Sequence, residues 1–119
     1  ASGEELASIR ASLKPAIEEL DEATRWLVET SPQNPKAAAG VSVPYLKLFG
    51  TVAGGWMMAR AALIARAKLT QPDADRDFLQ AKLATARFYA EHVLPQAASL
   101  AREVTRGAAS VLSLTPERF

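Results

Sequence analysis

The sequence contains no cysteine and only one histidine, His92. The lack of cysteine excludes disulfide bridges, thiolate metal ligands and cysteine nucleophiles, and it suits a reducing compartment. A di-iron centre in a helical bundle needs Glu-x-x-His pairs, but the residue three positions before His92 is Tyr89. We therefore expect no catalytic, cofactor-binding or metal-binding residue in this chain.

Long hydrophobic runs and an excess of one charge are also missing. The longest uncharged run, Leu48 to Ala59, is shorter than the roughly 20 residues of a membrane-spanning helix. The first residues include Glu4 and Glu5, where a secretory signal would be basic. The net charge of +1 gives no basic footprint for nucleic acid. We expect a cytoplasmic protein that binds neither membranes nor nucleic acid.

Alanine is abundant, and no segment alternates apolar and polar residues with a period of two. This pattern favours helix over sheet. Turn residues divide the chain into three long helical stretches, at about residues 3–30, 42–69 and 75–106. The predicted fold is all-α, an antiparallel bundle of three long helices forming a single domain over residues 1–119.

Two prolines lie inside the predicted helices, Pro15 and Pro95. The apolar stripe keeps its phase across both, so we expect kinks, and four or five segments if the helices break there. Between the helices, residues 31–40 are predicted to form a loop. Ser42 is a predicted N-cap, and Asp73, Asp75 and Asp77 are placed to supply a cap and negative charge at the start of the third stretch.

A glycine, Gly107, follows the third stretch and reads as its C-cap. The tail beyond it, residues 108–119, carries further apolar residues. We expect this tail to dock on the bundle.

Apolar residues recur at steps of three and four in each stretch, as on one face of a helix. The predicted stripe of the first stretch is Leu6, Ile9, Leu13, Ile17, Leu20, Ala23 or Thr24, and Leu27. The second stretch has two stripes, one of Tyr45, Phe49, Val52, Trp56 and Leu63 and one of Leu46, Ala53, Met57 and Ile64. The third has Leu79, Leu83, Ala86, Ala90, Val93, Ala97, Leu100 and Val104. Because the second stretch is apolar nearly all round, we expect it to be the central helix.

Three glycines in the second stretch, Gly50, Gly54 and Gly55, lower helix propensity. They allow either close packing inside the bundle or contact with another subunit or domain. In the third stretch, Phe78, Phe88 and His92 flank the core stripe, and they either enlarge the core or dock against a partner. The candidate interface residues are Gly50, Gly54, Met57, Met58, Phe78, Phe88 and His92.

Charged residues give weaker signals. Arg60, Arg66 and Arg87 could bind anionic groups of a cofactor, although no glycine loop accompanies them. Residues 1–30 hold seven acids against three bases, whereas residues 60–106 hold eight bases against five acids. We expect the acidic first helix to lie beside a basic one, and the acids at 18–22 to form a solvated face.

Two blocks go beyond generic helix: Pro44–Gly50 with Gly54–Trp56, and Lys82–Pro95. Together they resemble the C-terminal accessory domain of the acyl-CoA dehydrogenase family, in a bacterial subgroup of enzymes similar to 3-methylmercaptopropionyl-CoA dehydrogenase. The resemblance covers most of the chain. It implies a parent flavoprotein of fatty acid metabolism, in which FAD and a glutamate base act in other domains that oxidise an acyl-CoA.

The resemblance transfers no catalytic or FAD-binding residue to this chain. It implies a helical appendage, excised from a larger chain, whose partners are the other domains of the parent or a second subunit. Two alternatives stay open. One is a free-standing ligand-binding module with Trp26, Tyr45, Phe49 and Trp56 around a pocket. The other is a homodimeric interaction module.

Overall fold

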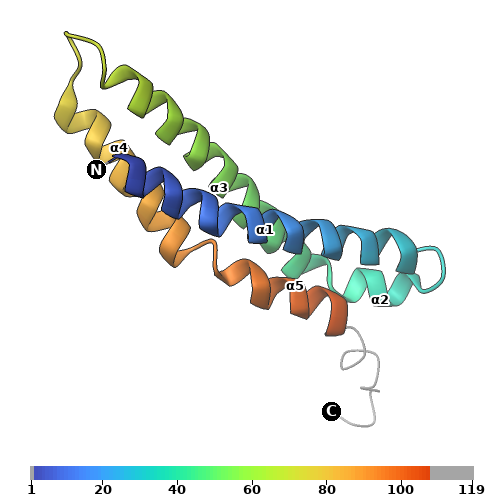
Figure 1. The fold of residues 1–119 in the computed structure, drawn as a ribbon. Helices are drawn as coiled ribbons and strands as arrows, with labels where there is room; N and C mark the ends of the chain where they lie inside the picture. Colours follow the sequence, from blue (N-terminus) through green and yellow to red (C-terminus); the bar gives the residue numbers. More distant parts are fainter. Residues whose placement is uncertain (1, 108–119) are drawn as a thin grey trace.

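The computed structural model describes residues 2–107, which form five α-helices and no strand (Figure 1). The helices are α1 (Ser2–Thr30), α2 (Pro35–Gly40), α3 (Ser42–Lys68), α4 (Arg76–His92) and α5 (Gln96–Arg106). The all-α prediction is confirmed. The predicted docking of residues 108–119 lies outside the described residues.

The helices form an elongated antiparallel bundle, 67 Å along its longest axis (Figure 1). α1 runs antiparallel to α3, while α4 follows the second half of α3 and α5 follows its first half. α3 and α1 each contact all four other helices, so the expected central position of α3 is shared with α1.

The two internal prolines have different outcomes. Pro15 lies within α1, which continues through it without a break. At Pro95 the chain breaks instead, because α4 ends at His92 and α5 begins at Gln96. The amides of Val93 and Leu94 both donate to the carbonyl of Tyr89, at 2.8 and 3.0 Å. Proline has no N–H to continue the ladder, so the helix restarts in a new direction.

Two predicted boundaries were wrong, and one was right. Residues 35–40 form α2 rather than loop, because the Asn34 side chain accepts the Ala37 amide and caps it. The N-cap of α3 is Val41, not Ser42, since α2 runs into α3 through that single residue. Of the three aspartates predicted to cap the third stretch, Asp75 is the N-cap of α4, accepting the Phe78 amide at 3.2 Å.

The C-cap of α5 is Gly107, as predicted. Its φ of −73° is not left-handed.

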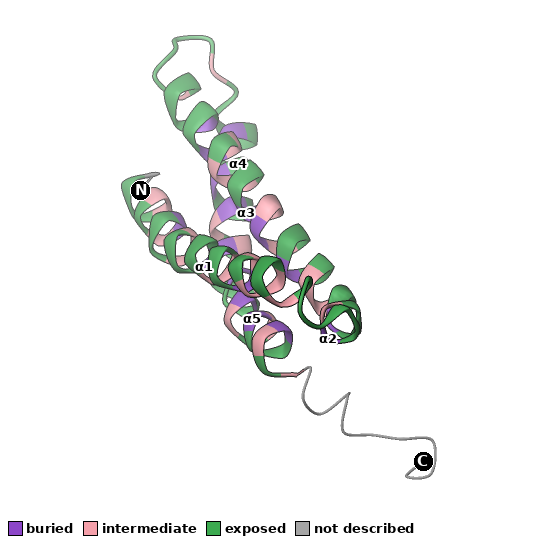
Figure 2. Cartoon of the chain, turned by 90° about the vertical axis from the view of Figure 1, so that its right-hand side faces the viewer, coloured by how far each residue is buried: buried purple, intermediate pink, exposed green. Residues whose placement is uncertain are grey.

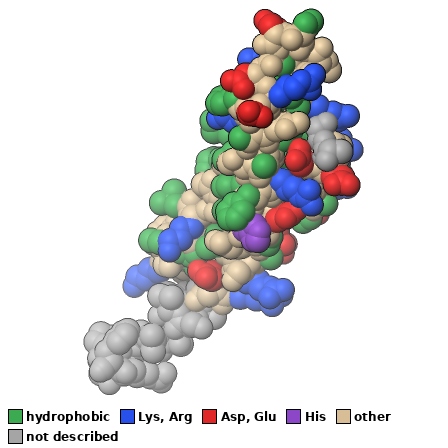
Figure 3. Space-filling view, turned by 90° about the vertical axis from the view of Figure 1, so that its left-hand side faces the viewer, with side chains coloured by type: hydrophobic (Ala, Val, Ile, Leu, Met, Phe, Trp, Pro, Cys, Tyr) green, Lys and Arg blue, Asp and Glu red, His purple; other side chains and the backbone are tan. Residues whose placement is uncertain are grey.

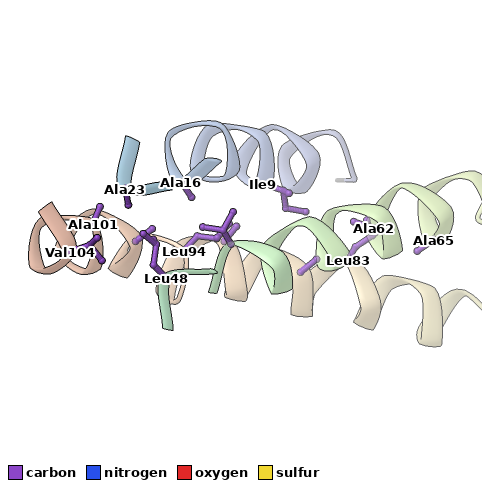
Figure 4. Packing of buried hydrophobic residues seen from close by; sticks show 14 of the residues in the cluster. Ile9, Ala16, Ala23, Leu48, Ala62, Ala65, Leu83, Leu94, Ala101 and Val104 are labelled. Carbon is purple, nitrogen blue, oxygen red and sulfur yellow. The ribbon is translucent and has the colours of Figure 1, made fainter. Parts of the chain in front are cut away.

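The core is a seam of small and medium side chains along the bundle (Figure 4). In α1 the buried residues follow a heptad spacing, Ile9, Ala16 and Ala23, with Leu6, Leu13, Leu20 and Leu27 partly buried beside them. The predicted Ile17 is 45% exposed, and Ala16 takes its place. In the third stretch Leu94 is buried instead of Val93, because the break at Pro95 turns the chain.

The predicted stripes of α3 were mostly wrong. Its buried residues are Leu48, Val52, Gly55, Ala62 and Ala65, of which the stripes included only Val52. Most of the large side chains in those stripes lie on the surface. Figure 2 shows the exposed residues along the outside of the helices and the buried ones along the seam. α3 thus turns its small side chains inward and leaves its large ones uncovered by this chain.

Candidate interaction surface

Large apolar side chains are exposed along the outer side of α3 and on the adjacent α4. We call this set the apolar face; it comprises Leu46, Phe49, Trp56, Met57, Ile64, Phe78 and Phe88. Leu46 is 68% exposed and Met57 65%. Figure 3 shows hydrophobic side chains gathered along one side of the molecule, next to His92, with the charged ones mostly on the other side. A patch of this kind marks an interaction site more often than an ordinary surface.

The edge of the apolar face between α3 and α4 is a shallow groove. It has a volume of about 190 Å³, and its lining includes Ala61, Ile64 and Phe78. Farther along α4, the rings of Phe88 and His92 lie 4.5 Å apart. Phe78, Phe88 and His92 are all exposed, so the expectation that they enlarge the core was wrong.

The three glycines of α3 serve different purposes. A side chain at Gly54 would collide with the hydroxyl of Tyr89, which donates a 2.7 Å hydrogen bond to the Thr51 carbonyl. A side chain at Gly55 would meet Leu94 at 2.6 Å. Both glycines therefore allow close packing inside the bundle. Gly50, by contrast, faces open space on the outer side of α3.

The predicted interface residues thus fall into two groups. Gly50, Met57, Phe78, Phe88 and His92 are exposed. Gly54 and Met58 are partly buried, Gly54 against Tyr89 and Met58 against the core. Within this chain, Gly54 is part of a contact between α3 and α4.

Residues that the sequence reasoning assigned to the core supply most of the apolar face. Leu46, Phe49, Trp56 and Ile64 belong to the two predicted stripes of α3. A signal for the correct face was present in the small residues Gly55, Ala62 and Ala65, which match the alanine-rich stripes of α1 and α4. Large side chains outweighed them in the prediction.

The three candidate arginines do not form one site. Arg87 lies between α4 and α1, where its Nε donates to Glu91 Oε1 at 2.7 Å and a guanidinium nitrogen lies 4.0 Å from Glu4. Arg60 lies 5.0 Å from the Trp56 ring centroid, and Arg66 lines a separate cleft between α1 and α3. The Arg87–Glu4 contact agrees with the predicted pairing of an acidic first helix with a basic one.

Glu91 is an acid whose pKa departs clearly from its usual value. Its hydrogen bond from Arg87 and another from Ser8 Oγ at 3.0 Å lower the pKa of the Glu91 carboxyl. The same contact with Glu91 raises the pKa of Arg87. The Arg87–Glu91 ion pair lies within α4 and is solvent-exposed, so it contributes little to stability, whereas the Ser8 hydrogen bond joins Glu91 to α1.

The four aromatic residues proposed to surround a pocket do not converge. Phe49 and Trp56 are 52% and 50% exposed on the outer side of α3. The Tyr45 hydroxyl instead bonds Thr24 Oγ1 at 2.8 Å, between α3 and α1. The predicted aromatic pocket was therefore wrong.

Two remaining features concern metal binding and membrane insertion. No group of three or more histidine, aspartate or glutamate side chains placed to hold a metal ion occurs within the described part of the chain. α3 is long and apolar enough, by length and composition alone, to cross a membrane. Within the described part of the chain, 28% of that apolar stretch is buried.

Comparison with known proteins now decides the family. Residues 1–115 match the family described as acetyl-CoA dehydrogenase C-terminal like. The chain is also 35% identical over 108 residues to 3-methylmercaptopropionyl-CoA dehydrogenase of Ruegeria pomeroyi. This chain belongs to the acetyl-CoA dehydrogenase C-terminal-like family. The alignment covers 91% of this chain but 17% of the relative, and no solved structure matches.

The two blocks that carry the resemblance to this family meet each other in space. Gly54 and Gly55 of the first block receive Tyr89 and Leu94 of the second. Tyr89 of the second block also donates a hydrogen bond to the carbonyl of Thr51, which lies between the two parts of the first block. The distinctive residues of this C-terminal domain thus form the joint between α3 and α4.

Proposed function

We propose that this chain is the C-terminal accessory domain of an FAD-dependent acyl-CoA dehydrogenase, and that the apolar face docks it on the other domains of that enzyme. The observation that carries the proposal is the uncovered row of large side chains on α3. Family membership and the 17% share of the relative's length support a larger parent chain. In the parent, a cytoplasmic enzyme, FAD and the catalytic base act in the other domains.

Docking would remove the apolar face from water. A fully buried Leu, Met or Phe side chain contributes roughly 1.5–3 kcal/mol, so several of them suffice for a stable domain contact. Gly50 lies on the same side of α3 and has nothing within 4 Å, so a partner helix can approach the backbone there. The charged groups on this side are basic, with Arg60 over Trp56 and Lys82 over Phe78.

The first test is the complete reading frame that contains this sequence. The proposal expects roughly 400 further residues upstream of Ala1, enough for several domains. The encoded protein should contain FAD and oxidise an acyl-CoA, whereas the 119-residue chain alone should do neither. A yellow stoichiometric complex of this chain with FAD would overturn the assignment.

A second test concerns the surface itself. Met57→Lys and Val28→Lys place the same charge at sites of similar exposure, 65% and 67%. Met57 belongs to the apolar face, whereas Val28 lies outside it and serves as the control. In the full enzyme, Met57→Lys should speed proteolytic release of this domain by about tenfold or more, since it buries a charge at the contact. Val28→Lys, on α1, should change it little.

The oligomeric state of the isolated chain separates the alternatives. Sedimentation velocity should show a monomer, because the apolar face belongs to the other domains of the parent. A dimer that Met57→Lys dissociates would assign the face to a second copy and would refute docking within one enzyme.

A further inference from the structure

A second concave surface lies between the first half of α1 and the last half of α3. This cleft has a volume of about 410 Å³, within the range of small-molecule sites. None of its lining residues belongs to the apolar face, so its role does not depend on the proposed function.

The floor of the cleft is aliphatic. Leu6, Ile9 and Leu13 line it from α1, and Ala59 and Leu63 line it from α3. Leu63 is 58% exposed although it lies next to the seam. The cleft thus offers one continuous hydrocarbon surface to an unbranched chain.

The cleft exists because α1 contacts α4 in its first turns. Glu4 and Ser8 reach Arg87 and Glu91 on that side. On the opposite side, α3 contributes Ala59, whose side chain is only a methyl group, between Leu63 and the rest of the lining. Small residues on α3 therefore leave space that α1 does not fill.

The charged groups of the cleft are all of one sign. Arg10 of α1 and Arg66 of α3 line it, and no aspartate or glutamate does. Neither guanidinium forms an ion pair within residues 3–107. Two arginines beside an aliphatic floor complement a ligand with a hydrocarbon chain and an anionic head, and the guanidinium fork fits a carboxylate.

We infer that the α1–α3 cleft binds an aliphatic carboxylate, with the chain along Leu6, Leu13 and Leu63 and the carboxylate between Arg10 and Arg66. An aliphatic carboxylic acid is ionised above about pH 5. Neutral pH therefore favours the complex.

Octanoate is a suitable probe, compared by calorimetry with 1-octanol, which lacks the charge, and acetate, which lacks the chain. Octanoate should bind this chain with a roughly millimolar Kd, as expected for a ligand of its size. Its saturation should shift the methyl NMR signals of Leu6, Leu13 and Leu63 but not of Leu46. Octanol that binds as tightly as octanoate, or no binding of octanoate, would overturn the inference.

The matched variants remove two positive charges each. Arg10→Gln with Arg66→Gln should weaken octanoate binding by about tenfold, since charge-assisted hydrogen bonds are lost. Arg102→Gln with Arg106→Gln, on the distant α5, should leave it unchanged. An equal loss of octanoate affinity in both double variants would show that only the net charge matters and would refute the site. Arg66→Lys, which keeps the charge and loses the fork, gives an intermediate affinity if the geometry matters. Circular dichroism checks that every variant keeps its helicity.

Discussion

The two sides of α3 differ in the size of their side chains more than in their polarity. The inner side packs with Leu48, Val52, Gly55, Ala62 and Ala65, whereas the outer side carries Leu46, Phe49, Trp56, Met57 and Ile64. In most domains the largest apolar side chains are buried. Here small side chains bring the helices of one chain close together, and the large ones lie exposed on the outer side.

The largest expected effect comes from two leucines on opposite sides of α3. Leu48 is fully buried and Leu46 is 68% exposed, and the two are only two residues apart. Leu48→Ala should lower the free energy of unfolding by about 3 kcal/mol, because it removes buried methyl groups and leaves a cavity. Leu46→Ala should change it by less than about 0.5 kcal/mol. Urea denaturation of the isolated chain measures both. Similar losses would show that the outer side is covered in solution.

Two glycines should respond with opposite signs. Gly55→Leu should destabilise the chain by about 1–3 kcal/mol, because its side chain enters the space of the buried Leu94. Gly50→Ala should stabilise it by up to about 1 kcal/mol, since alanine favours helix and meets nothing within 4 Å. Thermal melts compare the two variants. A Gly50→Ala variant that melts lower than the parent chain would contradict open space at that position.

The smallest effect concerns the joint between α3 and α4. Tyr89→Phe removes the hydrogen bond to the Thr51 carbonyl and should lower stability by about 1 kcal/mol. Burial raises the pKa of the Tyr89 hydroxyl above its usual 10.0. The stabilisation is therefore complete below pH 10 and is lost as pH rises through the raised pKa.

Denaturation as a function of pH tests this hydrogen bond, because phenylalanine keeps the ring and lacks only the hydroxyl. The difference in free energy of unfolding between the parent chain and Tyr89→Phe should shrink above pH 10. A difference that does not shrink as the hydroxyl ionises would contradict a contribution from this hydrogen bond.

The sequence was sufficient for the helical class and for an aspartate cap at the start of α4. These follow from local patterns, namely turn residues, helix spacing and side-chain capping. The break at Pro95 was less predictable. The apolar phase of the stripe continues across it, and only the geometry shows Leu94 replacing Val93 in the core.

The outer side of α3 could not be assigned from its own residues. When a helix is apolar nearly all round, its hydrophobic pattern does not indicate which side faces the core. The size of the side chains on α3 indicates the buried side only when the neighbouring helices are known, because the alanines of α1 and α4 determine how closely the helices approach. The cleft was missed for the same reason, since Arg10 and Arg66 are far apart in sequence and meet only through the packing of α1 on α3.

The contact between Leu94 and Gly55 has a consequence for local unfolding of the bundle. α4 and α5 each cover half of α3, and the residue between them is fixed at the middle of that helix. α4 and α5 can each open from the end that lies farther from Leu94. This local unfolding should stop at the contact between Leu94 and Gly55. Hydrogen exchange should therefore be slowest for the amides near Gly55 and become faster towards both ends of α3.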